Sequence, residues 1–188
     1  EIVTRAVGSE IRNGIEYSPG IPLGSLQTFT DLPQKKFPDP EWALKHRDKA
    51  LERFEYLKRS SKNAREIRTA EVDWFGAEEL LLLSKLAESD KLELACQSCL
   101  PAEVQVFRIG RYFFAAWPGE IFVEYALELK RENKNVFLIT LSNGELQGYI
   151  ATKEADDKGF YESGNSLFHY SAGQVLVDRT MEMIKQLK

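Results

Sequence analysis

The sequence has few cysteines and no long apolar run. Only two of its 188 residues are cysteine, which is too few for a disulfide framework and does not fix a redox compartment. No apolar run approaches the roughly 18 residues that a membrane-spanning helix needs. We therefore expect a soluble chain without a transmembrane segment. The compartment stays open, with secreted and periplasmic locations included.

The chain also lacks an excess of positive charge. It has 25 Lys and Arg against 29 Asp and Glu, which gives a net charge of -4. Because a nucleic-acid surface needs clustered basic side chains, nucleic acid is not an expected partner. Hydrophobic residues make up 43% and charged residues 29%, as in ordinary globular domains. A chain of this length can bury one sizeable core, so residues 1–188 are expected to form a single domain or a fragment of one.

The first forty residues divide into a predicted helix and a predicted loop. Apolar residues between Ile2 and Ile15 recur at helical spacing and predict an amphipathic helix over 1–17. Because the chain starts inside this helix, we expect it to be a fragment of a longer protein. Residues 18–40 are rich in proline and glycine and are expected to form an extended loop.

The next segment, 41–90, is predicted to be helical. Asp39 is suited to cap a helix that has Pro40 at its first position. A second helical region follows from about residue 64, and Gly76 is expected to break it. The charges on the first of these helices alternate in sign, which favours a solvated face over a binding surface for nucleic acid.

Residues 91–188 predict an α/β (α+β) fold with a mixed β-sheet core flanked by helices. The apolar period changes to that of strands after residue 91, and Gly110 between two such runs indicates a tight hairpin. A continuous apolar run is typical of a buried central strand. We expect strands at 92–100, 103–109, 111–117 and 135–141, a helix that begins after Pro118 and Gly119 with Glu120 in its first turn, and a last helix at 171–187.

The cysteines and histidines give only weak indications of chemistry. Cys96 and Cys99 have the spacing of half a zinc site or of a redox pair, but no second pair follows them. We interpret them as two small apolar side chains in or beside a sheet. His46 lies in a charged helix and is expected at the surface, whereas His169 could approach a site.

Three side chains in the C-terminal half form a more informative group. Glu120 follows a Trp-Pro-Gly turn where a strand ends, Tyr149 follows the next predicted strand and a polar loop, and Tyr161 lies in a stretch rich in Gly and Ser. Each residue also has a structural interpretation, because helix N-termini favour acids and loop tyrosines usually serve packing. Together, a carboxylate and a phenolate can ligate a metal, and a second phenol can donate to a developing oxyanion.

The segments VQVFRIGRYFFAAWPGE, LSNGELQGYIAT and FYESGNSLF resemble the C-terminal half of the catalytic domain of neutral/alkaline, non-lysosomal ceramidases and their bacterial relatives. The order and spacing of PGE, GYIAT and YES carry this resemblance, which covers about 101–188. It implies that the chain is the C-terminal portion of a larger catalytic domain. It also implies zinc-dependent hydrolysis of the N-acyl (amide) bond of a ceramide or a related lipid.

The resemblance assigns roles to the same three residues. It implies that Glu120 and Tyr149 are zinc ligands and that Tyr161 is a catalytic residue which stabilises the oxyanion. The family's two histidine ligands come from the N-terminal half of the same protein, so that half is an expected partner. Neither His46 nor His169 lies in a segment of that kind.

Two features leave the function open at this stage. Leu146 stands where the better-known members carry an aromatic residue, which puts the substrate, a ceramide or another N-acylated compound, in doubt. The second hypothesis is a non-catalytic α/β module, or a partner subunit, that kept the fold without a complete metal site. A third is a redox role for Cys96 and Cys99.

Overall fold

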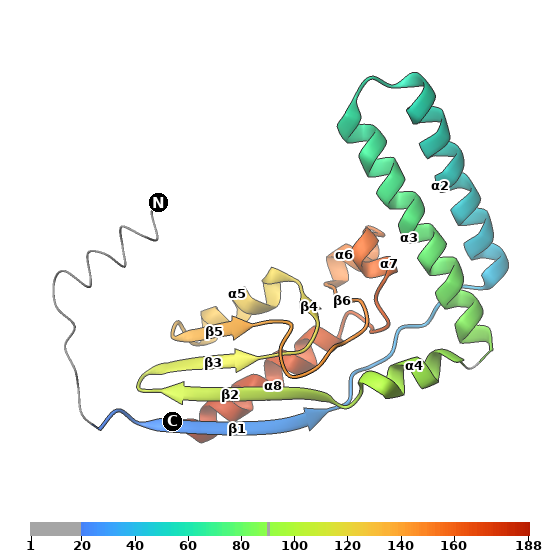
Figure 1. Ribbon diagram of the computed structural model, residues 1–188. Coiled ribbons are helices and arrows are strands. Elements are labelled where there is room, and N and C mark those ends of the chain that lie inside the picture. The colour runs from blue at the N-terminus through green and yellow to red at the C-terminus, as the bar shows by residue number, and fades with distance from the viewer. Residues whose placement is uncertain (1–19, 90) are drawn as a thin grey trace.

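The computed structural model describes residues 20–89 and 91–188 and has a mixed α/β fold (Figure 1). The expected fold class, a mixed sheet flanked by helices, is therefore confirmed. The helix expected at 1–17 lies outside the described residues. None of the helices in the described part is long and apolar enough to cross a bilayer.

The main sheet has four strands in the order β1-β2-β3-β5. Strand β2 is antiparallel to both β1 and β3, and β5 pairs with β3 in parallel. Gly110 has a φ of +61° in the turn between β2 and β3, so the predicted hairpin is confirmed. The strands are β1 (Leu23–Thr30), β2 (Ala102–Ile109), β3 (Tyr112–Ala116) and β5 (Val136–Ile139).

A separate pair of short parallel strands lies beyond the end of this sheet. It consists of β4 (Glu120–Ile121) and β6 (Tyr149–Ile150). The helices are α2 (Pro40–Ser60), α3 (Ala64–Glu88), α4 (Lys91–Cys99), α5 (Val123–Glu132), α6 (Lys153–Asp157), α7 (Tyr161–Gly164) and α8 (Ala172–Leu187).

Helices α5 and α8 pack on one face of the main sheet. Alternate residues of the strands, such as Val104, Val106 and Phe113, point into this layer and are buried with Leu129 and Ile184 of the helices. Helices α2 and α3 form a long hairpin that projects away from the sheet, and α6 and α7 lie between the hairpin and the sheet (Figure 1).

The opposite face of the sheet, called the outer face below, carries apolar side chains that the described residues leave exposed. Phe107 pairs with Phe114 across β2 and β3, and the ring of Phe114 stacks on that of Phe137. The exposed members of this face are 37% to 76% accessible: Leu23, Phe29, Phe107, Ile109, Tyr112, Phe137 and Ile139.

Two segments differ in type from the sequence prediction. The expected loop at 18–40 contains strand β1, an edge strand that forms because the prolines of this segment all lie outside its eight residues. The expected strand at 92–100 is helix α4. Its buried residues are Leu92 and Cys96, which are four positions apart and therefore share one helical face.

The helical prediction for 41–90 is correct except at its break. Asp39 accepts hydrogen bonds from the backbone of Glu41 and Trp42, and Pro40 is the first residue of α2, as expected. Helix α3 continues through Gly76 without interruption, so the expected break is wrong. Gly76 is buried, and its missing side chain leaves room for a neighbouring ring.

Two further predictions in the C-terminal half need correction. Glu120 is not in the first turn of a helix, because it lies in β4 and helix α5 begins three residues later. The expected central strand at 135–141 is β5, which is at an edge and has exposed Phe137 and Ile139. The last helix, α8, matches its prediction within one residue.

Candidate functional site

A cavity of about 420 Å³ lies at the β4–β6 pair. Its walls come from four separate parts of the chain: α3, β4, the 141–148 loop with the β6 strand that follows it, and the α7 region. The lining residues are Phe75, Glu79, Glu120, Leu141, Glu145, Leu146, Gln147, Gly148, Tyr149, Tyr161 and Asn165. The three residues that the sequence singled out, Glu120, Tyr149 and Tyr161, therefore lie in one cavity.

Glu120 and Tyr149 are direct neighbours across the two parallel strands. Paired residues of adjacent strands project to the same side, so both side chains lie together on the cavity wall. The Glu120 side chain is exposed, and Tyr149 is half-buried. Burial raises the pKa of the Tyr149 phenol, and the negative charge of Glu120 raises this pKa further.

Backbone hydrogen bonds hold the turn that leads to Glu120. Leu141 N donates to Gly119 O at 3.1 Å, and Ser142 N donates to Trp117 O at 3.0 Å. The chain that leaves β5 is thereby tied to the Trp-Pro-Gly turn. The loop that precedes Tyr149 and the turn that precedes Glu120 are thus fixed to each other before the two strands pair.

Tyr161 is the first residue of α7 and faces the same cavity. Its ring meets that of Tyr149 edge to face, with 6.4 Å between the ring centroids. On its other side the Tyr161 ring lies against Gly76 of α3. Gly76, which was expected to break the helix, therefore leaves the space that the Tyr161 ring occupies.

Asn165 joins the Tyr161 segment to the Tyr149 strand. Its Nδ2 donates to the carbonyl oxygen of Tyr161 at 3.0 Å. Gly148 has a φ of +79°, and a Cβ at this position would lie only 2.0 Å from the Asn165 carbonyl oxygen. The close approach of these two backbones sets the position of Tyr149 relative to Tyr161. The Asn165 Oδ1 atom is buried and has no hydrogen-bond partner among the described residues.

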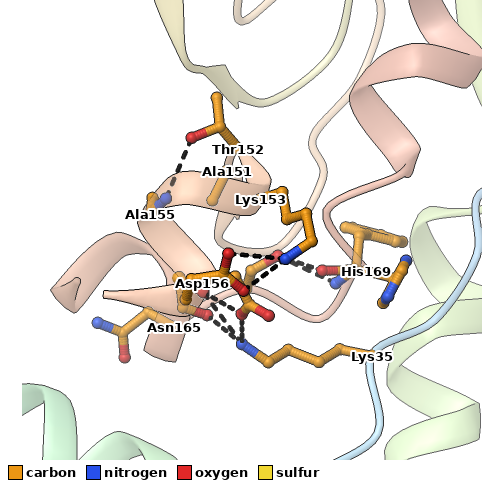
Figure 2. A network of polar contacts seen from close by, with 12 residues as sticks. Lys35, Ala151, Thr152, Lys153, Ala155, Asp156, Asn165 and His169 are labelled. Atoms are coloured by element: carbon orange, nitrogen blue, oxygen red, sulfur yellow. Dashed lines mark hydrogen bonds and ion pairs between the residues drawn. The ribbon is translucent and has the colours of Figure 1, made fainter. Parts of the chain in front are cut away.

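A polar network anchors the α6–α7 segment (Figure 2). Lys35 Nζ lies 2.7 Å from Asp156 Oδ1 and also donates to the Ser163 backbone oxygen at 2.9 Å. The Ser163 hydroxyl donates to the same Asp156 oxygen. Burial acts to raise the pKa of Asp156, but the hydrogen bonds from Lys35 and Ser163 outweigh it and lower that pKa. The network holds α7, and with it Tyr161, against the 31–39 segment.

Sequence reasoning missed the contribution of α3 to this cavity. Phe75 and Glu79 both line it and are four residues apart on the same face of the helix. A Phe followed four positions later by an acid was the available signal, but such pairs are common on helices that form no site. Only the tertiary contact between α3 and α7 distinguishes this one.

The histidines and cysteines lie elsewhere. His46 is on the exposed side of α2, where it stacks on Trp42, as expected for a surface residue. His169 Nδ1 is 2.8 Å from the Ser171 hydroxyl and does not line the cavity. Cys96 is buried and Cys99 is half-buried on α4, so their expected position in a strand is wrong.

The cavity offers oxygen ligands rather than a complete metal site. Across residues 20–89 and 91–188, no group of three or more His, Cys, Asp or Glu side chains is placed to hold a metal ion. Glu120 and Tyr149 together supply one carboxylate and one phenol on the same wall, which fits half of a four-coordinate zinc site. Leu146 is buried and packs against Gly119 beside this pair.

Comparison of the chain with protein-family models, with curated proteins and with solved structures found no match. The chemistry that the cavity can support therefore follows from its own residues. Three carboxylates, two phenols and two amides line it, a set that can bind a cation and donate hydrogen bonds to an oxygen.

Proposed function

We propose that this chain is the C-terminal part of a ceramidase-like, zinc-dependent amidohydrolase that cleaves the N-acyl bond of a ceramide or a related lipid. The observation that carries the proposal is the pairing of Glu120 with Tyr149 across β4 and β6, with Tyr161 edge to face against Tyr149. These residues are 29 and 12 positions apart in sequence, yet they share one cavity, as the resemblance of their motifs implies.

Each of the three residues has a distinct role in this proposal. The Glu120 carboxylate and the Tyr149 phenolate would bind zinc, which in such sites lowers the pKa of water toward neutrality and polarises the scissile carbonyl. Tyr161 would donate its phenolic hydrogen to the carbonyl oxygen as negative charge develops there. Its ring is held between Tyr149 and Gly76, so the hydroxyl needs little reorganisation at the moment of reaction.

The remaining zinc ligands are proposed to come from an N-terminal half of the same protein. The outer face of the sheet supports this part of the proposal. Helices α5 and α8 cover one face, whereas Phe107 and Phe137 on the other are exposed among the described residues. A predominantly antiparallel sheet can leave one face in water, but such a face is normally polar, whereas this one carries large apolar side chains. A preceding half of the domain would cover this apolar surface.

The test uses the intact gene product, with whatever precedes residue 1. Its zinc content is measured by mass spectrometry, and its hydrolysis of N-acyl sphingosine is followed by release of fatty acid. We expect bound zinc, loss of zinc and activity in Glu120→Ala, and a fall in kcat of about 10²–10³ in Tyr161→Phe with zinc retained.

Glu124→Ala is the matched control, because Glu124 is an exposed acid four residues further along on α5, outside the cavity. It should keep both zinc and activity. An intact protein that binds no zinc, and whose hydrolysis survives Glu120→Ala, would contradict the proposal. That result would leave the non-catalytic α/β module as the better interpretation.

A further inference from the structure

A second and larger cavity lies between the α2–α3 hairpin and the α6–α7 segment. It is an open groove of about 1190 Å³ with its floor on α2 and α3. One side is formed by the 35–38 segment and the other by residues 158–164. Figure 1 shows how the hairpin leans away from the body of the protein and leaves α6 and α7 facing its inner side.

The groove has apolar side chains that water reaches, both on its floor and on its two sides. Trp42 is 53% exposed and Phe160 is 45% exposed, although both are large apolar side chains. Leu80, Ala77 and Phe37 extend this surface along the groove. An elongated apolar surface of this kind gains free energy when a hydrocarbon chain covers it.

The charged residues of the groove are predominantly basic. Its lining includes five Lys or Arg and three Asp or Glu side chains, whereas the whole chain has more acids than bases. Lys35 and Arg53 are paired with Asp156 and Asp73 respectively. Lys36 and Lys49 form no ion pair with the described residues. An anionic head group beside an apolar chain complements this combination.

The groove also adjoins the candidate site. Tyr161 lines both cavities, and the two are separated by the contact of its ring with Gly76. Glu120 and Tyr149, in contrast, line the smaller cavity alone. A chain bound in the groove would therefore contact Tyr161 but neither of the proposed zinc ligands.

We propose that this groove binds a long-chain fatty acid, with the hydrocarbon chain on Trp42 and Phe160 and the carboxylate near Lys36 and Lys49. The choice of a fatty acid over other anionic amphiphiles rests on the proposed function, because a fatty acid is the acyl product of that reaction. The apolar lining and the basic side chains of the groove support the binding of an anionic amphiphile in general.

The experiment titrates the purified chain with palmitate and follows binding by calorimetry. We expect saturable binding that weakens about tenfold or more in Trp42→Ala, which removes the largest apolar contact. The double variant Lys36→Glu/Lys49→Glu should weaken palmitate binding by a similar factor at low salt, and less at high salt. Hexadecanol, which has the same chain without a charge, should bind more weakly and should respond to Trp42→Ala only.

Matched controls come from the same hairpin. Tyr56→Ala removes another exposed aromatic residue of α2, and Lys62→Glu reverses a charge in the hairpin turn; neither residue lines the groove. Both variants should bind palmitate as the parent chain does. A circular dichroism spectrum of each variant confirms that the hairpin is still folded.

Three results would overturn the proposal. These are no saturable binding of palmitate, equal affinity in the groove variants and the controls, or equal binding of palmitate and hexadecanol. A self-associating chain whose dimer is lost in Trp42→Ala would instead assign the groove to a second copy. The two proposals can fail independently. If the intact protein binds palmitate but hydrolyses no amide, the proposed enzyme activity is rejected and the fatty-acid groove is retained. If it hydrolyses the amide but binds no palmitate, the groove is rejected and the enzyme activity is retained.

Discussion

The ring of Tyr161 lies directly against the backbone of Gly76, and a Cβ built on that glycine would come within 3.0 Å of the Tyr161 Cδ2 atom. A glycine inside an exposed helix lowers helix stability by about 1 kcal/mol relative to alanine. Here the glycine brings α3 and α7 close enough to place a phenol between two cavities. Gly76 thus determines the position of Tyr161 and does not end or break helix α3.

Gly76→Ala should therefore move the Tyr161 ring with little effect on stability. The gain in helix propensity offsets the displacement of the ring, so we expect the free energy of unfolding to change by less than about 1 kcal/mol. The NMR signals of the Tyr161 ring should shift clearly in a tyrosine-labelled sample. Gly164→Ala is the control, because a Cβ there meets no atom within 4 Å. An unchanged spectrum of the Tyr161 ring in Gly76→Ala would show that the position of the ring does not depend on the missing side chain at residue 76.

Gly148→Ala should destabilise the protein much more. The backbone at Gly148 has a φ of +79°, and the new Cβ would lie 2.0 Å from a carbonyl oxygen that belongs to Asn165. A left-handed conformation costs a non-glycine residue about 1–2 kcal/mol, and the clash with a backbone atom adds to this. We expect a loss of more than about 2 kcal/mol in urea unfolding.

Gly159→Ala separates these two effects. Gly159 also has a positive φ, +64°, but a Cβ there meets nothing within 4 Å. It should cost about 1 kcal/mol, from conformational strain alone. Equal losses in Gly148→Ala and Gly159→Ala would mean that the approach of Asn165 to Gly148 does not matter.

Thr180→Val should be costly although it preserves side-chain volume. The indole nitrogen of Trp117 donates to Thr180 Oγ1 at 2.8 Å, and both residues are 0% exposed. Removal of the hydroxyl leaves a buried donor without a partner, which costs about 1–3 kcal/mol. Urea unfolding measures the loss. Thr69→Val, at an exposed position on α3, makes the same chemical change and should cost less than about 0.5 kcal/mol.

The Asp156 network should make stability fall in acid. The pKa of Asp156 is lower in the folded protein than its ordinary value of 3.8, so the unfolded state binds the proton more readily. Its contribution to stability is therefore complete above about pH 4 and is lost as the pH falls through the folded-state pKa. Urea unfolding of the parent chain and of Asp156→Asn should differ at pH 6 and converge toward pH 2.

Asp31→Asn is the control for this measurement, since Asp31 is exposed and its side chain has no ion pair within the described part of the chain. It should follow the parent curve at every pH. A constant difference between the parent chain and Asp156→Asn down to pH 2 would exclude a contribution from the titration of Asp156.

The two cysteines should react with a thiol reagent at very different rates. Cys96 is 0% exposed, and burial raises the pKa of its thiol, whereas Cys99 is only half-buried. We expect one fast thiol in the folded protein and two after unfolding. Fast reaction of both thiols in the folded protein would revive the hypothesis of a redox pair.

The parts of the fold that local signals determine were predictable from the sequence. The cap formed by Asp39 and Pro40, the hairpin at Gly110 and the amphipathic pattern of α8 depend on neighbouring residues, and all three are confirmed. Helix α4 was missed because nine residues with apolar positions at both two-residue and four-residue spacing fit either structure.

Long-range pairing decided the remaining features. Whether β5 is central or at an edge depends on which strands lie beside it, and its own apolar run does not contain that information. The grouping of Glu120, Tyr149 and Tyr161 could be proposed from motif spacing, but Phe75 and Glu79 could not. Their place in the cavity follows from the contact of α3 with α7, which the sequence of α3 alone does not encode.

The β4–β6 pair contains only two matched positions, Glu120 with Tyr149 and Ile121 with Ile150. Successive residues of a strand face opposite sides, so a shift of one residue would turn the carboxylate and the phenol away from each other. Ile150 is buried, and the same shift would expose it. The alignment of the two polar groups is thus encoded in an apolar residue that faces the opposite side of the strand pair, and a repacked core at Ile150 would change the chemistry of the cavity wall without altering any of its polar residues.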